Sequence, residues 1–110
     1  MGLKWYEFAT IMENEFEYDP VKSASNQGKH GIDFAEAQLL WTVYGWEQPS
    51  PFLSESRIQR TTPIQGRLWT AVFTVHGCRI RLISVRRARK DEVETYERSI
   101  AENPGTDLES

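Results

Sequence analysis

Three neighbouring stretches with strand-like patterns, joined by short turns, constrain the fold of this chain more than any other feature. They span residues 57–62, 67–75 and 78–85, and His76-Gly77 separates the last two. So short a turn joins antiparallel strands, because a parallel pair needs a crossover of a dozen or more residues. The middle stretch carries apolar residues on both faces, as a central strand does. These stretches predict a mostly antiparallel sheet.

Helices are predicted on either side of these strands. The stretch "EFEYDP", residues 15–20, alternates as a short strand does, and Asp19-Pro20 can then cap and open a helix that stops near Gly28 to Gly31. Asp33 opens a second helix that runs to about Tyr44, and residues 46–55 form a Pro- and Ser-containing loop. A last helix covers about residues 89–102. The order β-α-α-β-β-β-α predicts an α+β fold with the helices packed against one face of the sheet.

Length and composition predict one small domain. The chain has 110 residues, which form a single core, with residues 1–14 as an N-terminal extension and 103–110 as a C-terminal tail around a domain of residues 15–102. No apolar run is long enough to cross a bilayer, and the N-terminus lacks the pattern of a secretory signal. Cys78 is the single cysteine, which fits a reducing compartment, so we expect a cytoplasmic protein without a membrane partner.

A basic run stands out in this acidic chain. The formal net charge is −3, yet residues 79–90, "RIRLISVRRARK", contain six basic residues and no carboxylate. Strand alternation puts Arg79 and Arg81 on one face and Arg86 on the other, unless the strand ends or twists between them. One interpretation is a solvated corner whose charges are paired with the acidic residues downstream, Asp91, Glu92, Glu94 and Glu97. The other is a phosphate-binding surface, because guanidinium groups bind phosphate bidentately.

Two further places in the sequence carry candidate chemistry. His30 follows Lys29 at a predicted helix end, where it can act as a general acid or base or simply complement the helix dipole. Glu55 and Arg57 are two residues apart, as an ion pair or as a catalytic carboxylate held by its own arginine. With two histidines, one cysteine and no ligand motif, the sequence predicts no metal site and no cofactor.

Two long motifs, one on each side of the predicted central strands, stand out as units. The first is "FEYDPVKSASNQGKHGIDFAEA", with an aromatic–acid–aromatic–Asp start, a spaced lysine, Lys-His-Gly and a Phe-x-x-Ala helix. The second is "RIRLISVRRARKDEVETYE", with an arginine, a hydrophobic pair, Ser84 and a further arginine. Together with Glu55-x-Arg57, these motifs resemble the BrnT family, small toxins of type II toxin–antitoxin systems. Tyr18 replaces the family's usual Trp and Val85 its usual Ala.

The resemblance, which covers about residues 15–98, implies a small RelE-like domain. It also implies a metal-independent endoribonuclease that cleaves RNA and arrests growth, and neutralisation by a BrnA-like antitoxin in a hetero-oligomer. On this basis we expect the residues in catalysis to be His30, Glu55, Arg57, Arg81 and Arg86. We expect the residues that bind RNA to be Lys22, Lys29, Arg79 and Arg87. The alternative is a non-catalytic module that binds RNA or protein through the same arginine-rich surface.

Overall fold

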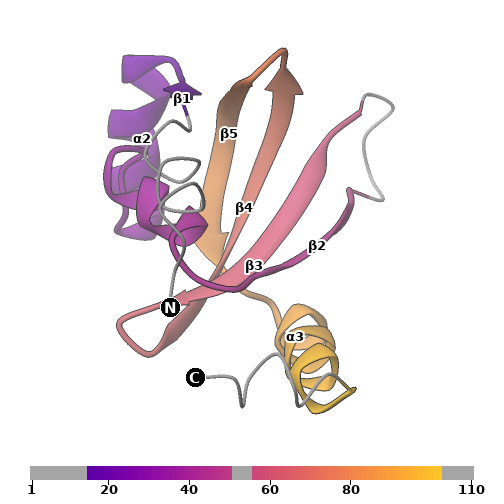
Figure 1. The fold of residues 1–110 in the computed structure, drawn as a ribbon. Coiled ribbons are helices and arrows are strands. Elements are labelled where there is room, and N and C mark those ends of the chain that lie inside the picture. The colour runs from indigo at the N-terminus through magenta and orange to yellow at the C-terminus, as the bar shows by residue number, and fades with distance from the viewer. Residues whose placement is uncertain (1–14, 51–55, 103–110) are drawn as a thin grey trace, which may run out of the picture.

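The computed structural model describes residues 15–50 and 56–102, which form a five-stranded sheet with helices around it (Figure 1). The strand order is β1-β5-β4-β3-β2; β1 runs parallel to β5, and the other neighbours are antiparallel. The strands are β1 (Glu15–Glu17), β2 (Trp46–Pro49), β3 (Ile58–Ile64), β4 (Arg67–His76) and β5 (Arg79–Arg87). The helices are α2 (Pro20–His30), the 3-10 helix η1 (Glu36–Trp41) and α3 (Lys90–Glu102). The α+β fold is therefore confirmed.

The three predicted neighbouring strands form the meander β3-β4-β5 with β4 in the centre. Gln65 and Gly66 both have positive φ between β3 and β4, as a two-residue type I′ hairpin turn requires. Gly77 has a φ of 63° between β4 and β5. The turn residues therefore explain why these strands are consecutive neighbours in the sheet.

Strand β2 corrects the prediction of a loop over residues 46–55. Trp46–Pro49 pairs antiparallel with β3, from Trp46 opposite Thr61 to Pro49 opposite Ile58. A proline is tolerated there because β2 lies at the edge of the sheet, where one side of the strand needs no partner. Its polar residues and proline resemble a loop, and only the pairing makes it a strand.

The first predicted helix is confirmed and the second is shorter than expected. Asp19 Oδ1 accepts a hydrogen bond from Val21 N at 2.8 Å, and Gly31 closes α2 with a φ of 84°. Asp33 Oδ1 accepts from Glu36 N, as predicted for a cap, but the segment continues only as the 3-10 helix η1.

Contacts of Arg60 explain why the second helix ends at Trp41 and not near Tyr44 as predicted. Its Nε donates to Leu40 O at 2.9 Å, and its Nη2 donates to Val43 O at 2.7 Å. Both carbonyls are thereby bound by a side chain from β3 rather than by the next turn of an α-helix. The segment between η1 and β2 is fixed to the sheet in this way.

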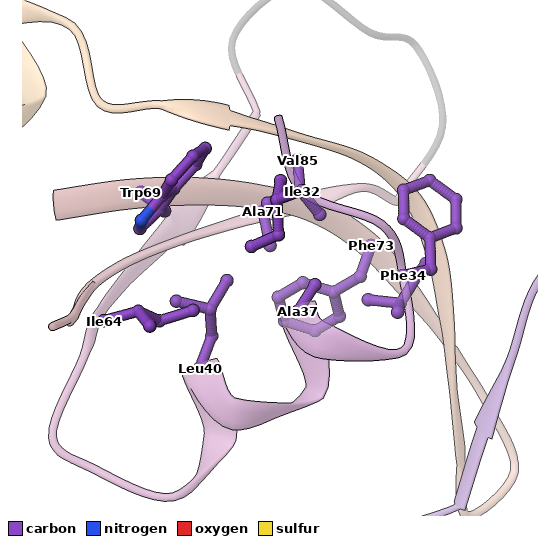
Figure 2. Packing of buried hydrophobic residues seen from close by; sticks show 10 residues of the cluster. Ile32, Phe34, Ala37, Leu40, Ile64, Trp69, Ala71, Phe73 and Val85 are labelled. Carbon is purple, nitrogen blue, oxygen red and sulfur yellow. The ribbon is translucent and has the colours of Figure 1, made fainter. Parts of the chain in front are cut away.

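The hydrophobic core lies between η1 and one face of the sheet (Figure 2). Leu40 from η1 and Ala71 from β4 are fully buried in it. The side chain of Thr70, the residue before Ala71, lies on the other face of the sheet. There it donates a hydrogen bond to Glu92 of α3. The core residues are Ile32, Phe34, Ala37, Leu40, Ile64, Trp69, Ala71, Phe73, Leu82 and Val85. Because η1 and α3 use opposite faces, the prediction that all helices pack on one face is wrong.

Helix α2 is attached to the sheet by one buried side chain. Asn26 Nδ2 donates to Val85 O at 2.8 Å, and Asn26 Oδ1 accepts from Val85 N at 3.2 Å. Strand β1 pairs only with residues 79–81 of β5, so Asn26 binds β5 farther along the same edge. The same Nδ2 also donates to Ile32 O at 2.8 Å, which holds the chain that follows α2. Asn26 thus positions α2 beside β5.

Candidate nucleic-acid interface

A β-bulge in β5 brings the predicted arginines to one face of the sheet. Arg81 is opposite Thr74 and Arg86 is opposite Thr70, and the two threonines, four residues apart on β4, share a face. Leu82 pairs with Phe73 and Ser84 with Val72, so Ile83 is the extra residue between them. The prediction that Arg81 and Arg86 lie on opposite faces is therefore wrong, because a bulge reverses the alternation.

Two arginines on this face have carboxylate partners from β1, of which Glu15 is exposed and Glu17 is half-buried. Arg79 Nε donates to Glu15 Oε1 at 3.0 Å, and Arg81 Nη1 donates to Glu17 Oε1 at 2.9 Å. The arginine side chains are 59% and 43% exposed. Exposed ion pairs of this kind contribute about 0–1 kcal/mol, so an anionic ligand can replace the carboxylates at little cost.

Arg86 is held far more firmly. Its Nη1 and Nη2 each donate to Glu92 at 2.8 Å, and its side chain is 16% exposed. Glu92 is buried and also accepts from Thr70 Oγ1 at 2.9 Å and from Arg89 N at 2.8 Å, the latter as in a helix capping box. Burial alone would raise the pKa of Glu92, but the hydrogen bonds from Arg86, Arg89 and Thr70 outweigh it and lower the pKa to about 2.

The pairing with a downstream acidic residue that the sequence offered as an alternative exists between Arg86 and Glu92, but this pair is largely buried and not solvated. It fixes the guanidinium of Arg86 on the same face as Arg81. Two terminal N–H groups of Arg86 point at Glu92, and a guanidinium has five N–H groups in all. Arg86 can thus add positive charge to the face without leaving its carboxylate.

A pocket of about 240 Å³ adjoins this face between α2 and the bulge. Helix α2 contributes Lys22, Lys29 and His30, and β5 contributes Ile83 and Ser84. Lys22 and Lys29 are seven residues apart, which places them on one side of the helix. Ser84 pairs with Val72 and so lies on the same face as the arginines. The bulge therefore connects the pocket, which we call the α2 pocket, with the arginine face.

The remaining predicted residues lie elsewhere. Arg57 is half-buried just before β3, and continuing the β3–β4 register by one residue brings it level with Thr74, across β4 from Arg81. Arg87 lies on the opposite face from Arg86, with Cζ 5.6 Å from the ring centroid of Trp69. Glu55 lies outside the residues that the structure describes.

Sequence reasoning missed the acidic and histidine residues of this face. Glu15 and Glu17 alternate with Phe16, which packs against the core, so both carboxylates lie on the face away from the core. This alternation was the signal in the sequence that could have found them. From the sequence, His76 was assigned to a hairpin turn, where it and Cys78 are too few to make a metal site, yet it pairs with Arg79 and shares the face of Arg81. Knowing which strand lies next to β5 was necessary to bring these residues together.

Residues 15–50 and 56–102 contain no group of three or more His, Cys, Asp and Glu side chains arranged to hold a metal ion. None of the helices in the same ranges has the length and apolar character to cross a membrane.

Comparison with known protein families identifies the relatives of this chain. Residues 18–92 match the family model described as ribonuclease toxin, BrnT, of type II toxin–antitoxin system. The chain belongs to the BrnT family. The matched range contains the α2 pocket, the bulge, Arg81 and Arg86, and it ends at Glu92. None of the curated proteins compared with the chain matched it. BrnT membership implies a ribonuclease toxin with an RNA target and an antitoxin protein partner.

Proposed function

We propose that this BrnT-family chain is a metal-independent endoribonuclease that binds RNA phosphates on the arginine face and in the α2 pocket. The observation that supports this most is the bulge at Ile83, because it puts Arg81 and Arg86 on one face beside the lysines of α2. Residues 15–102 form the toxin domain, of a RelE-like type. The toxin acts in the cytoplasm and arrests growth until a BrnA-like antitoxin neutralises it.

The proposed reaction is attack by a ribose 2′-hydroxyl on its neighbouring phosphate. The 2′-oxygen–phosphorus bond forms, the bond from phosphorus to the 5′-oxygen breaks, and the products are a 2′,3′-cyclic phosphate and a free 5′-hydroxyl. A base takes the 2′ proton, and an acid gives a proton to the leaving 5′-oxygen. Negative charge grows on the phosphorane oxygens, and preorganised cations that stabilise such charge usually make the largest contribution.

The roles follow from how tightly each arginine is held. Arg81, which is itself 43% exposed, leaves Glu17 and binds the reacting phosphate, while Arg86, fixed by Glu92, adds charge beside it. Arg57 approaches the same phosphate from across β4. His30 in the α2 pocket, or Glu55, accepts the 2′ proton.

Neighbouring phosphates bind on either side of the reacting one. Arg79 and the α2 lysines Lys22 and Lys29 are the proposed ligands there, because all three are exposed. Arg87 contacts RNA only where the strand passes around the sheet edge to the opposite face. An antitoxin that covers this surface needs carboxylates of its own to replace Glu15 and Glu17, which an acidic helix or strand provides.

The test is cleavage of a labelled RNA by the purified chain in excess chelator. We expect cleavage to persist, and Arg81→Ala to reduce it by about 10²–10³, the loss typical of removing one donor to transition-state charge. Arg67→Ala is the matched control, because Arg67 is exposed on the same sheet but pairs with Ile64 on the core face. Activity that disappears with chelator, or an Arg81→Ala variant as active as Arg67→Ala, contradicts the proposal.

The carboxylates that already occupy the arginines favour one alternative, a module that binds RNA or an acidic partner without cutting. Binding alone predicts affinity that falls with salt, by about −0.7 in log K per log salt for each phosphate neutralised on a single strand. It predicts no shortened RNA and no growth arrest when the chain is expressed alone.

A further inference from the structure

His76, at the end of β4, lies in a group of interacting side chains on the arginine face. Its Nδ1 is 3.9 Å from Glu17 Oε2, and the other oxygen of that carboxylate accepts from Arg81 Nη1 at 2.9 Å. Its Nε2 is 3.5 Å from Thr74 Oγ1. One carboxylate therefore lies against both a histidine ring and the arginine proposed to bind the reacting phosphate.

The two ring nitrogens have different surroundings. Nδ1 lies on the side of Glu17, at ion-pair distance, which leaves Nε2 as the nitrogen that can exchange a proton with a substrate. The hydroxyl of Thr74 is at the outer limit of a hydrogen bond, so a substrate oxygen can replace it easily. The side chain is 56% exposed, so RNA can reach it.

From this geometry we propose that His76 is the general acid of RNA cleavage, a role that rests on the proposed function. It donates the Nε2 proton to the 5′-oxygen as the phosphorus–oxygen bond breaks. The 2′ proton has meanwhile passed to the base, so His76 finishes neutral and regains a proton from water. Before RNA binds, Arg81 and His76 share Glu17 as an anchor, which places the phosphate ligand and the acid next to each other.

The charged groups that face His76 come from two strands. Glu17 comes from β1, and Arg81 comes from β5, as does Arg79, which is the register partner of His76. Arg79 is itself paired with Glu15. Two carboxylates thus balance two guanidinium groups around the ring, and an RNA phosphate that takes the place of Glu17 on Arg81 adds one negative charge beside it.

The test compares two versions of one RNA oligonucleotide that the chain cleaves. One has an ordinary linkage at the cleavage site, and the other has sulfur in place of the 5′-oxygen, a leaving group that needs no protonation. We expect His76→Gln to lose about 10²–10⁴-fold in cleavage of the ordinary linkage, the usual contribution of a general acid. On the sulfur linkage we expect a loss below about tenfold. His30→Gln, at the other histidine of the chain, is expected to change the rates on both substrates by the same factor, whether or not His30 is the base.

Each result decides the role. A His76→Gln variant that cleaves the ordinary linkage at the full rate, or that is equally impaired on both substrates, overturns the general-acid role and leaves the proposed function standing. Absence of cleavage by the unsubstituted chain overturns the proposed function, and the role of His76 with it. A circular-dichroism melt of each variant confirms that it is folded, which we expect because both histidines are exposed.

Discussion

Replacing Glu92 by glutamine removes a charge that three elements of the fold depend on. The carboxylate binds Arg86 twice, Thr70 of β4 and the backbone N–H of Arg89 that precedes α3. Glutamine keeps the shape but replaces one acceptor oxygen by an NH₂ group. Arg86 then keeps a buried charge with a neutral partner, which is a strongly destabilising arrangement.

The pKa of Glu92 sets the size of the effect. It falls from the ordinary value of 4.5 to about 2 in the folded chain. Each pKa unit corresponds to about 1.4 kcal/mol, so the ionised carboxylate contributes about 3 kcal/mol to the free energy of unfolding at pH 7. Because the folded-state pKa is the lower one, this contribution is complete above pH 4.5 and is lost as the pH falls towards 2. At pH 3 about half of this contribution remains.

Urea denaturation followed by circular dichroism at pH 7 and pH 3 measures both quantities. At pH 7 we expect Glu92→Gln to lose about 3 kcal/mol in free energy of unfolding relative to the unsubstituted chain. At pH 3 we expect this loss to be about half as large. Glu97→Gln, at an exposed position on the same helix, is the control and should change stability by less than about 0.5 kcal/mol. A Glu92→Gln deficit that is the same at both pH values would refute the ionic origin of the stabilisation.

Two further substitutions test the packing that positions the site. Asn26→Ala leaves Val85 N and O without their side-chain partner, and we expect a loss of about 3 kcal/mol in urea denaturation; a loss no larger than that of the exposed neighbour Ser25→Ala would contradict this. Gly45→Ala puts a methyl group 2.7 Å from Cζ of Arg60, whose guanidinium is held by two carbonyls. We expect about 1–3 kcal/mol of destabilisation by the same measurement, and an unchanged midpoint would show that Arg60 moves aside.

Local sequence signals predicted the elements that depend on local chemistry. Asp19 caps α2 and Gly31 ends it as expected, because caps and turns are decided by a few adjacent residues. Strand β2 was missed because its polar residues become a strand only by pairing with β3. The early end of the second helix was missed for a similar reason, since Arg60 binds its carbonyls from 20 residues away.

The candidate site shows the same division. The basic run and the α2 residues were visible as motifs, and the family match confirms the relationship that they indicated. Their arrangement was not visible, because Ile83 is an ordinary strand residue and becomes a bulge only through the register with β4. The contact of Glu17 with His76 and Arg81 likewise required knowing that β1 lies beside β5.

The bulge at Ile83 also has a consequence for comparing sequences. On a regular strand, two side chains share a face only when an even number of positions separates them, yet Arg81 and Arg86 are five positions apart. An odd sequence interval between two arginines that share a face therefore indicates that the strand between them contains a bulge residue. A related toxin that lacks the insertion would need its second arginine one position earlier, so the parity of this interval predicts from sequence alone which relatives carry the bulge.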